Sequence, residues 1–242
     1  MRFILSLISL YLLTFSQLGF CFSPLEAKIS EADSLFESQQ YIDAYNLYDD
    51  LLSNDGAYSS RMLLRMSFIQ EGQNNYSKAL YYLNLQYRLT ADRQTLNKMS
   101  KIAEENNLVG YQYSDKEFFV SLFNNLQEII AIVLITLITI CLVIMFIRKK
   151  QNLSITTLTF FVTVFCGIGL WAYNGGIQRA QAIVKNNGAL LMEEPSAGGR
   201  KLGVVVQGER LKIESDNDIW YKVKLPNEAE GYIRKGRVLE VK

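Results

Sequence analysis

Three features of this 242-residue sequence predict a multidomain membrane protein. Its predicted parts are an all-α helical-repeat domain, a two-helix transmembrane hairpin and a small all-β barrel. Two long apolar runs stand on either side of a short basic segment. A motif recurs at a spacing of 35 residues before these runs, and hydrophobic residues alternate with a period of two after them. These patterns are typical of membrane-spanning helices, helical-hairpin repeats and antiparallel strands, respectively.

The two apolar runs cover residues 129–147 and 153–173 and contain no charged residue. A helix rises about 1.5 Å per residue, so about 20 apolar residues cross a hydrocarbon layer of about 30 Å. Residues 148–152 form a turn between the two predicted spans. Its cations are Arg148, Lys149 and Lys150. Because basic loops are retained in the cytoplasm, this turn is predicted to be cytoplasmic, with both outer ends of the hairpin on the opposite side.

The N-terminus is predicted to be a secretory signal, residues 1–23. Arg2 precedes an apolar run over residues 3–13, which is the usual order of charge and hydrophobicity in such a signal. Cleavage after Cys21 and cleavage after Ala27 are both compatible with the residues before each bond. An uncleaved segment forms a third span with its N-terminus in the cytoplasm, and the topology of the rest is then unchanged.

Composition argues against most kinds of catalysis. The chain has no histidine, the commonest general base and metal ligand. Its cysteines, Cys21, Cys141 and Cys166, lie in the signal and the two spans, so neither a disulfide framework nor a zinc site is expected. The sequence also lacks a Gly-rich phosphate loop, a nucleophile elbow and a dinucleotide fingerprint. We therefore expect a non-enzymatic protein without cofactors.

The two soluble portions differ in charge. Residues 22–128 contain 9 basic and 15 acidic residues, whereas residues 174–242 contain 12 basic and 9 acidic residues. Neither balance is extreme enough to indicate nucleic-acid binding, and the predicted location outside the cytoplasm also argues against it. Protein or envelope partners are therefore expected for both portions.

The first soluble portion, residues 27–107, is predicted to form helical repeats. The segment Tyr41–Tyr48 recurs as Tyr76–Leu83, and each copy follows an amphipathic stretch and a polar break. Small Ala44 and Ala79 allow two helices to approach closely, with a large residue four positions later on the same face. The repeating unit is therefore helix, turn, helix. A further amphipathic helix over residues 93–106 is expected to cap the stack.

The same segments resemble the tetratricopeptide repeat in its aromatic-x-x-Ala-x-x-x-large motif. The resemblance covers residues 27–90, with Gln39 and Gln40 where the family has a small residue. Such repeats bind a partner segment along the concave face made by their first helices. The resemblance implies that Arg61, Arg65 and Phe68 project into that face. The alternative is that the two arginines form a solvated helix face without a binding role.

Two connecting segments flank the hairpin. Residues 108–128 are aromatic and mixed in charge, and they are predicted to form a juxtamembrane lead-in at the membrane interface. Residues 174–187 are predicted to be a linker to the C-terminal domain.

The C-terminal portion, residues 188–242, is predicted to be a small antiparallel barrel, since short alternating runs are separated by Gly, Pro and Asp-Asn turns. About 55 residues provide a small core, so a closed barrel with few open edges is the expected architecture. The order of segments resembles a bacterial SH3-like domain. These segments are Leu190–Pro195, Gly208–Leu211, Asp218–Val223 and Glu230–Ile233. Tyr232 stands where that family usually has Trp.

Trp220, Lys222 and Tyr232 are the candidate binding residues of this domain. Alternation places Tyr221 and Val223 on one face of a strand and Trp220, Lys222 and Lys224 on the other. A Trp beside two lysines fits a half-exposed ring that contributes to an aromatic surface for a peptide or for the cell wall. The alternative is that the Trp220 ring belongs to the core, with Tyr221 outward.

The order of parts, from signal to SH3-like domain, resembles the BatE-type envelope proteins of bacterial aerotolerance operons. This resemblance implies a scaffold in the bacterial inner membrane whose soluble domains face the periplasm. The implied partners are membrane-bound proteins, including those with von Willebrand-type domains. The main functional hypothesis is therefore a membrane-anchored adaptor. The alternative is an anchor or sensor that binds peptidoglycan through the SH3-like domain.

Overall fold

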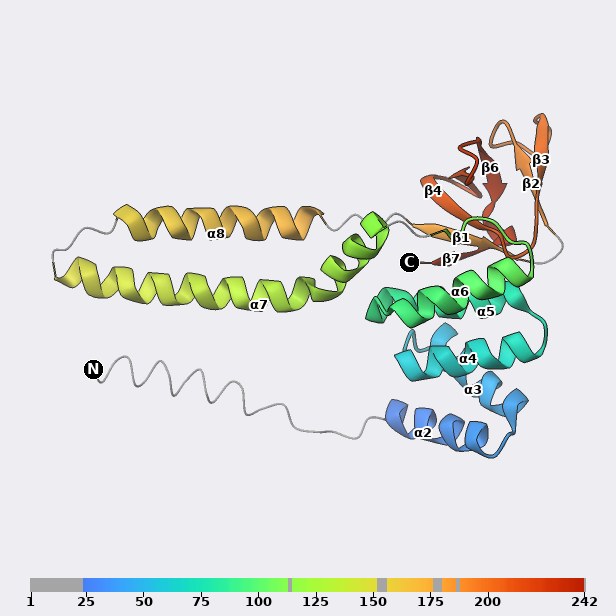
Figure 1. The fold of residues 1–242 in the computed structure, drawn as a ribbon, viewed down its shortest axis with the longest axis horizontal. Coiled ribbons are helices and arrows are strands. Elements are labelled where there is room, and N and C mark those ends of the chain that lie inside the picture. Colours follow the sequence, from blue (N-terminus) through green and yellow to red (C-terminus); the bar gives the residue numbers. More distant parts are fainter. Residues whose placement is uncertain (1–23, 113–114, 152–155, 176–179, 186–187, 242) are drawn as a thin grey trace. The chain divides into compact units, whose positions relative to one another are not determined.

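The computed structural model describes residues 24–112, 115–151, 156–175, 180–185 and 188–241. The predicted signal, residues 1–23, lies outside the described residues, as do parts of the predicted turn, linker and second span. The chain divides into two compact units, Met1–Tyr58 and Ser59–Lys242. Helices fill the first part of the described chain and seven strands follow them (Figure 1).

The first unit contains a helical hairpin formed by α2 (Pro24–Glu37) and α3 (Tyr41–Ser53). The apolar side of α3 is buried through Ala44, Tyr48 and Leu51. The Tyr48 hydroxyl donates a hydrogen bond of 2.6 Å to Asp33 on α2, so the two helices are held by a polar contact as well as by packing. The predicted burial of the small and large residues of this motif is confirmed here.

The second unit begins with α4 (Ser60–Gly72), α5 (Tyr76–Thr90) and α6 (Arg93–Glu105). Side-chain oxygens of Ser59 and Asp92 accept hydrogen bonds from the first turns of α4 and α6, which fixes where these helices start. Ala79 and Leu83 on α5 are fully buried. Tyr82 and Tyr87 on the same helix are also buried.

One turn geometry recurs after α2, α4 and α6. Gln39, Asn74 and Asn107 all have left-handed backbone conformations, with φ of 62°, 59° and 54°. In each case the next residue's N–H bonds the carbonyl five positions back, at 2.8–2.9 Å, and the left-handed residue's N–H bonds the carbonyl three positions back. This is the Schellman pattern of helix termination. The sequence repeat at 35 residues therefore has a matching backbone repeat.

Replacing Gln39 with glycine is expected to raise the free energy of unfolding by about 0.5–1 kcal/mol, because glycine adopts positive φ without the steric cost that a side chain brings. Gln40 provides a matched control, since its φ is −82°. Glycine at that position only adds freedom to the unfolded chain, so Gln40→Gly is expected to destabilise. Thermal unfolding of the two full-length variants, followed by circular dichroism in detergent, measures both changes. An equal effect at both positions would contradict the role of the turn.

The apolar runs form α7 (Asp115–Lys150) and α8 (Thr156–Gly175). α7 has 36 residues, so most of the predicted juxtamembrane segment is the first part of the same helix as the predicted span. The 33 residues from Phe118 to Lys150 are long and apolar enough to cross a membrane. Among the described residues, α8 contributes a shorter apolar stretch, Thr156–Leu170.

α7 and α8 pack against each other along their lengths (Figure 1). A Cβ added to Gly169 would lie 3.7 Å from the Leu134 side chain, which shows how closely the helices approach there. Threonine hydroxyls within α7 turn back onto their own helix, as in the 2.8 Å bond from Thr139 to the Ile135 carbonyl. The hydroxyl of Thr139 is thereby hydrogen-bonded within its own helix, as an apolar environment would require.

The C-terminal strands form one antiparallel sheet of seven strands in the order β3-β2-β6-β5-β4-β1-β7. The strands are β1 (Gln181–Val184), β2 (Ala189–Met192), β3 (Lys201–Val205), β4 (Arg210–Asn217), β5 (Trp220–Lys224), β6 (Glu230–Arg234) and β7 (Val238–Val241). A short 3-10 helix, η1 (Lys235–Arg237), precedes β7. Alternate residues of several strands meet in a single apolar core that includes Val184, Leu211, Val223 and Ile233.

β1 lies within residues 174–187, for which the sequence predicts a linker, and this part of the prediction is wrong. The strand has only four residues, too few to display an alternating pattern by itself. It nevertheless lies between β4 and β7 and buries Ala182, Ile183 and Val184. Long-range pairing therefore decides the structure of this segment.

Candidate functional site

The outward face of β5 and β6 brings the three predicted residues of the β-domain together. Lys222 lies directly opposite Tyr232, and Trp220 lies opposite Arg234 in the same pair of strands. Tyr221 and Val223, which alternate with them, belong to the buried core. The predicted division of β5 into two faces is therefore correct.

Lys222 is held between two carboxylates. Its Nζ lies 2.6 Å from Glu230 on β6 and 3.0 Å from Glu214 on β4. These hydrogen bonds, first that of Glu230 and then that of Glu214, raise the pKa of Lys222. The same bond lowers the pKa of Glu230. The lysine is therefore fixed in place and largely neutralised by its neighbours, rather than projecting as an isolated cation.

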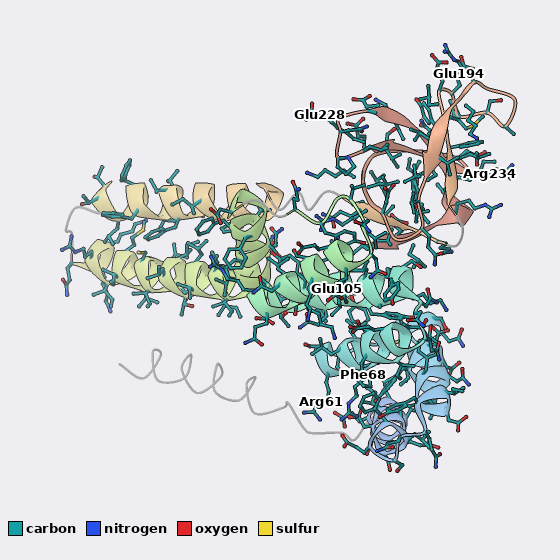
Figure 2. All side chains as sticks on the ribbon, turned by 45° about the vertical axis from the view of Figure 1, so that its right-hand side comes forward. Arg61, Phe68, Glu105, Glu194, Glu228 and Arg234 are labelled. Carbon is teal, nitrogen blue, oxygen red and sulfur yellow. The ribbon has the colours of Figure 1, made fainter. Side chains whose placement is uncertain are left out.

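Trp220 differs from the expectation, because only 7% of its surface is exposed. The ring is on the outward face, yet the guanidinium of Arg234 lies 5.7 Å from its centroid. Figure 2 shows Arg234 extending from β6 beside this strand pair. Alternation predicts the face on which a ring lies but not how deeply the ring is buried there, so the expected half exposure of Trp220 was wrong.

The arrangement offers an aromatic and cationic surface made of Tyr232 and Arg234, with Trp220 buried beside them. Tyr232 is partly exposed and Arg234 is exposed. An arginine over an aromatic ring is oriented by a cation–π contact and retains its N–H donors for a carboxylate. This face is therefore suited to a ligand with a carboxylate and a flat or apolar group. No acid–base pair is needed for such binding.

Tyr221 gives the domain a distinct pH dependence. Its hydroxyl donates a 2.6 Å hydrogen bond to Glu240 on β7. Burial, together with the hydrogen bond and charge of Glu240, raises the pKa of Tyr221 to about 12. Since an unfolded tyrosine titrates near 10, the folded state retains the proton longer. The stability contributed by this group is complete below about pH 10 and is lost as pH rises from about 10 to 12.

The free energy of unfolding of Tyr221→Phe is therefore expected to fall less steeply with pH in alkaline solution than that of the wild type. The difference in thermal midpoint between wild type and variant should narrow between about pH 10 and 12. Tyr58→Phe, at a tyrosine that is 41% exposed, is the matched control and should run parallel to wild type. Parallel curves for Tyr221→Phe as well would contradict the assignment.

The predicted residues of the helical domain lie on one face of α4. Arg61, Arg65 and Phe68 follow the i, i+4, i+7 spacing of a helix face. Arg61 is exposed, Arg65 is half-buried, and Phe68 is 50% exposed beside Leu64 (Figure 2). The structure thus gathers these side chains on one surface, and their role in binding a partner stays a prediction.

The three predicted topology residues, Arg148, Lys149 and Lys150, occupy the last turn of α7. Cations at a helix C-terminus interact favourably with the helix dipole. The position at the end of α7 does not by itself determine which side of a membrane this end of the helix faces. Their control of orientation also stays a prediction.

A contact that the sequence did not predict joins the segment after α6 to β4. The Arg210 Nε donates a 2.6 Å hydrogen bond to the Gly110 carbonyl, and its guanidinium lies 5.1 Å from the centroid of the Tyr111 ring. The Tyr111 hydroxyl donates a 2.7 Å bond to the Gly208 carbonyl. Arg210 and Tyr111 are both about 5% exposed, so the contact is a buried one.

A cavity of about 1060 Å³ opens beside this contact. Its lining includes side chains of α6, the segment 108–112, β4 and the loop after β5. The basic lining residues are Arg93, Arg210, Lys212 and Lys224, and the acidic ones are Glu104, Asp115 and Glu228. These charges nearly cancel, so the cavity has no strong preference for an anion or a cation.

Comparison with known families assigns part of this region. Residues 191–238 match the bacterial SH3 domain family. The match runs from β2 into β7 and includes the whole β5–β6 face. It confirms the predicted SH3-like domain for this segment. β1 lies before the matched residues and completes the sheet between β4 and β7. A search of curated proteins gave no match to the chain.

Proposed function

We propose that this chain is a non-enzymatic, membrane-anchored adaptor that binds envelope proteins through its soluble domains. The match of residues 191–238 to the bacterial SH3 domain is the observation that supports this most strongly, because such domains are binding modules. The β5–β6 face, with Tyr232 and Arg234 beside the buried Trp220, is the proposed docking surface.

The helical domain is proposed as the second binding module. The recurring turn at Gln39, Asn74 and Asn107 supports a repeat architecture, and the tetratricopeptide-like motif supports its use in protein recognition. In this proposal the face of Arg61, Arg65 and Phe68 receives a segment of a partner. The resemblance to BatE-type proteins points to membrane-bound partners with von Willebrand-type domains.

The proposed topology places both soluble domains in the periplasm, with Arg148–Lys150 on the cytoplasmic side. Single cysteines in a chain whose own cysteines are replaced by serine can test this. Cysteine at exposed Asn227 or Asp43 is expected to react with a membrane-impermeant reagent in intact spheroplasts, whereas cysteine at Gln151 is expected to react only after lysis. Protection of Asn227→Cys in intact cells would overturn the topology without affecting the adaptor proposal.

Photo-crosslinking tests the adaptor role itself. A photoreactive residue at Tyr232, in native membranes, is expected to capture a membrane protein that mass spectrometry identifies. Arg234→Glu should reduce its recovery at least about 10-fold, since the docking face loses its cation. Arg237→Glu removes a nearby exposed arginine with the same charge change and should leave recovery unchanged. Equal recovery in both variants would exclude this face.

Peptidoglycan binding is the second candidate, because the bacterial SH3 match is also compatible with a cell-wall ligand. Retention of the detergent-solubilised full chain on purified cell wall separates the two. If the protein is an adaptor, the wild-type chain and the Arg234→Glu variant should be retained on cell wall to the same low extent. Retention that Arg234→Glu abolishes would favour the wall-binding anchor. Hydrolysis of wall or peptide that a single substitution abolishes would instead favour an enzyme.

A further inference from the structure

The cavity between α6 and β4 has its charges unevenly placed, although their sum is small. Its three carboxylates, Glu104, Asp115 and Glu228, all belong to exposed residues. Arg210, in contrast, is 5% exposed, and the Lys224 side chain is 32% exposed. Charges in deeper positions are screened less by water and salt. The depth of the cavity therefore favours an anionic group, whereas its rim favours a cationic one.

Three cations stand together on the wall that the sheet contributes to this cavity. Lys212 on β4 lies directly opposite Lys224 on β5, so both side chains are on the same face. Arg210 is two positions before Lys212 on β4 and shares that face. Like charges in opposed positions destabilise a pair of strands, and an anion bound between them offsets that cost. The 3.6 Å ion pair of Lys224 with Glu228 offsets little of it, because the Glu228 side chain is 84% exposed.

One end of the cavity is formed by the start of α7 (Figure 1). Asp115 and Phe118 line it there, and the Arg93 guanidinium lies 4.4 Å from the centroid of the Phe118 ring. Asp115 is the first residue of α7, where the helix dipole compensates a negative charge. Phe118 begins the 33-residue stretch that is long and apolar enough to cross a membrane. The cavity therefore lies at the end of the helix that is proposed to enter the bilayer.

An apolar stripe leads from this end of the cavity along α7. Phe119, Leu126 and Val133 are 63%, 38% and 52% exposed. Their spacing of seven residues places them on one face of the helix. The rings of Phe118 and Phe119 are in contact, with 6.0 Å between their centroids, so the stripe begins at the cavity lining. Such a face is suited to the acyl chain of a lipid.

We propose that this cavity binds the headgroup of a zwitterionic phospholipid, one that carries an amine beyond its phosphate, while an acyl chain follows the stripe on α7. The phosphate lies among Arg210, Lys212 and Lys224, and the ammonium group meets the exposed carboxylates. A headgroup with only negative charge leaves those carboxylates uncompensated, so an anionic lipid fits less well. This inference goes beyond the adaptor role and rests only on the membrane anchoring that the proposed function includes.

Native mass spectrometry of the full chain in neutral detergent tests the lipid class. One molecule of dioleoyl-phosphatidylethanolamine is expected to bind at least about 10-fold more tightly than dioleoyl-phosphatidylglycerol, whose headgroup has no cation. Free O-phosphoethanolamine should bind weakly, because it has no acyl chain for the stripe. Equal retention of the two lipids, or equally tight binding of free O-phosphoethanolamine, would overturn the assignment.

Charge reversal locates the lipid on the chain. Lys212→Glu is expected to weaken the retention of dioleoyl-phosphatidylethanolamine at least about 10-fold, since it reverses one of the three charges around the phosphate. Lys201→Glu is the matched control, because Lys201 is an exposed lysine of β3 outside the cavity lining. It should retain the lipid as the wild type does. Equal retention by the two variants would exclude the cavity as the site.

A second pair of variants guards against an effect on folding. Thermal unfolding of Lys212→Glu in detergent should match that of the wild type, and if it does not, Phe119→Asn on exposed α7 decides instead. Phe119→Asn is expected to lower lipid retention, whereas Ile219→Asn, at a residue that is 50% exposed, is not. Equal retention in this pair would contradict the role of the stripe. None of these readouts requires a protein partner, so their failure leaves the crosslinking at Tyr232 and the cysteine labelling to decide the proposed function separately.

Discussion

Gly110→Ala is expected to destabilise the unit Ser59–Lys242 by about 2–5 kcal/mol. Gly110 has φ of +96°, where a Cβ costs about 1–2 kcal/mol. That Cβ would also lie 2.3 Å from the Arg210 carbonyl oxygen, a backbone atom that cannot move aside without shifting β4. Overpacking of this kind costs about 1–3 kcal/mol or more. Thermal unfolding of the full chain in detergent is expected to show a midpoint lower by on the order of 10 °C.

Substitutions at two other glycines separate the cost of the positive φ from the cost of the steric contact. Gly56 has φ of +62° with nothing near an added Cβ, so Gly56→Ala measures the cost of the conformation alone. Gly236 has neither a positive φ nor a close neighbour, and Gly236→Ala should be nearly neutral. If Gly110→Ala behaved like Gly56→Ala, the close contact between the segment after α6 and β4 would be disproved.

Sequence reasoning could not predict the Gly110–Arg210 contact, because the two residues are 100 positions apart and Gly110 stands in no motif. A local signal could indicate only that Gly110 follows a helix. By contrast, the helices and most strands are dictated locally, by spacing of apolar residues and by turn residues. Gln39 shows a limit even there, since a left-handed turn forms without the small residue that the repeat pattern leads one to expect.

The candidate binding face was predicted in part. Residue type and alternation predict that Trp220, Lys222 and Tyr232 share one face of the sheet, since positions on one face recur with a period of two. The register between β5 and β6 was needed to show that Arg234 lies beside Trp220 and that Glu230 forms an ion pair with Lys222. Register depends on the turn and the core together, so a single strand's sequence cannot supply it.

Gly231→Ala is expected to destabilise the β-domain by about 1–3 kcal/mol or more, although Gly231 does not have a positive φ. An added Cβ would lie 2.7 Å from the Leu191 side chain and 2.9 Å from the Met192 carbonyl oxygen. Leu191 is itself 5% exposed and lies in the core, so it has little space to withdraw. β6 must then shift away from β2, and Tyr232, which pairs with both Met192 and Lys222, shifts with it.

A double-mutant cycle isolates the steric cause. Leu191→Ala alone leaves a cavity and costs about 2–5 kcal/mol, but it also vacates the space that the new Cβ enters. The double variant should therefore lose less stability than the sum of the two single variants. Recovery is expected to be partial, because the Met192 carbonyl remains in place. Additive losses would mean that Gly231 matters for backbone freedom rather than for the close packing of β6 on β2.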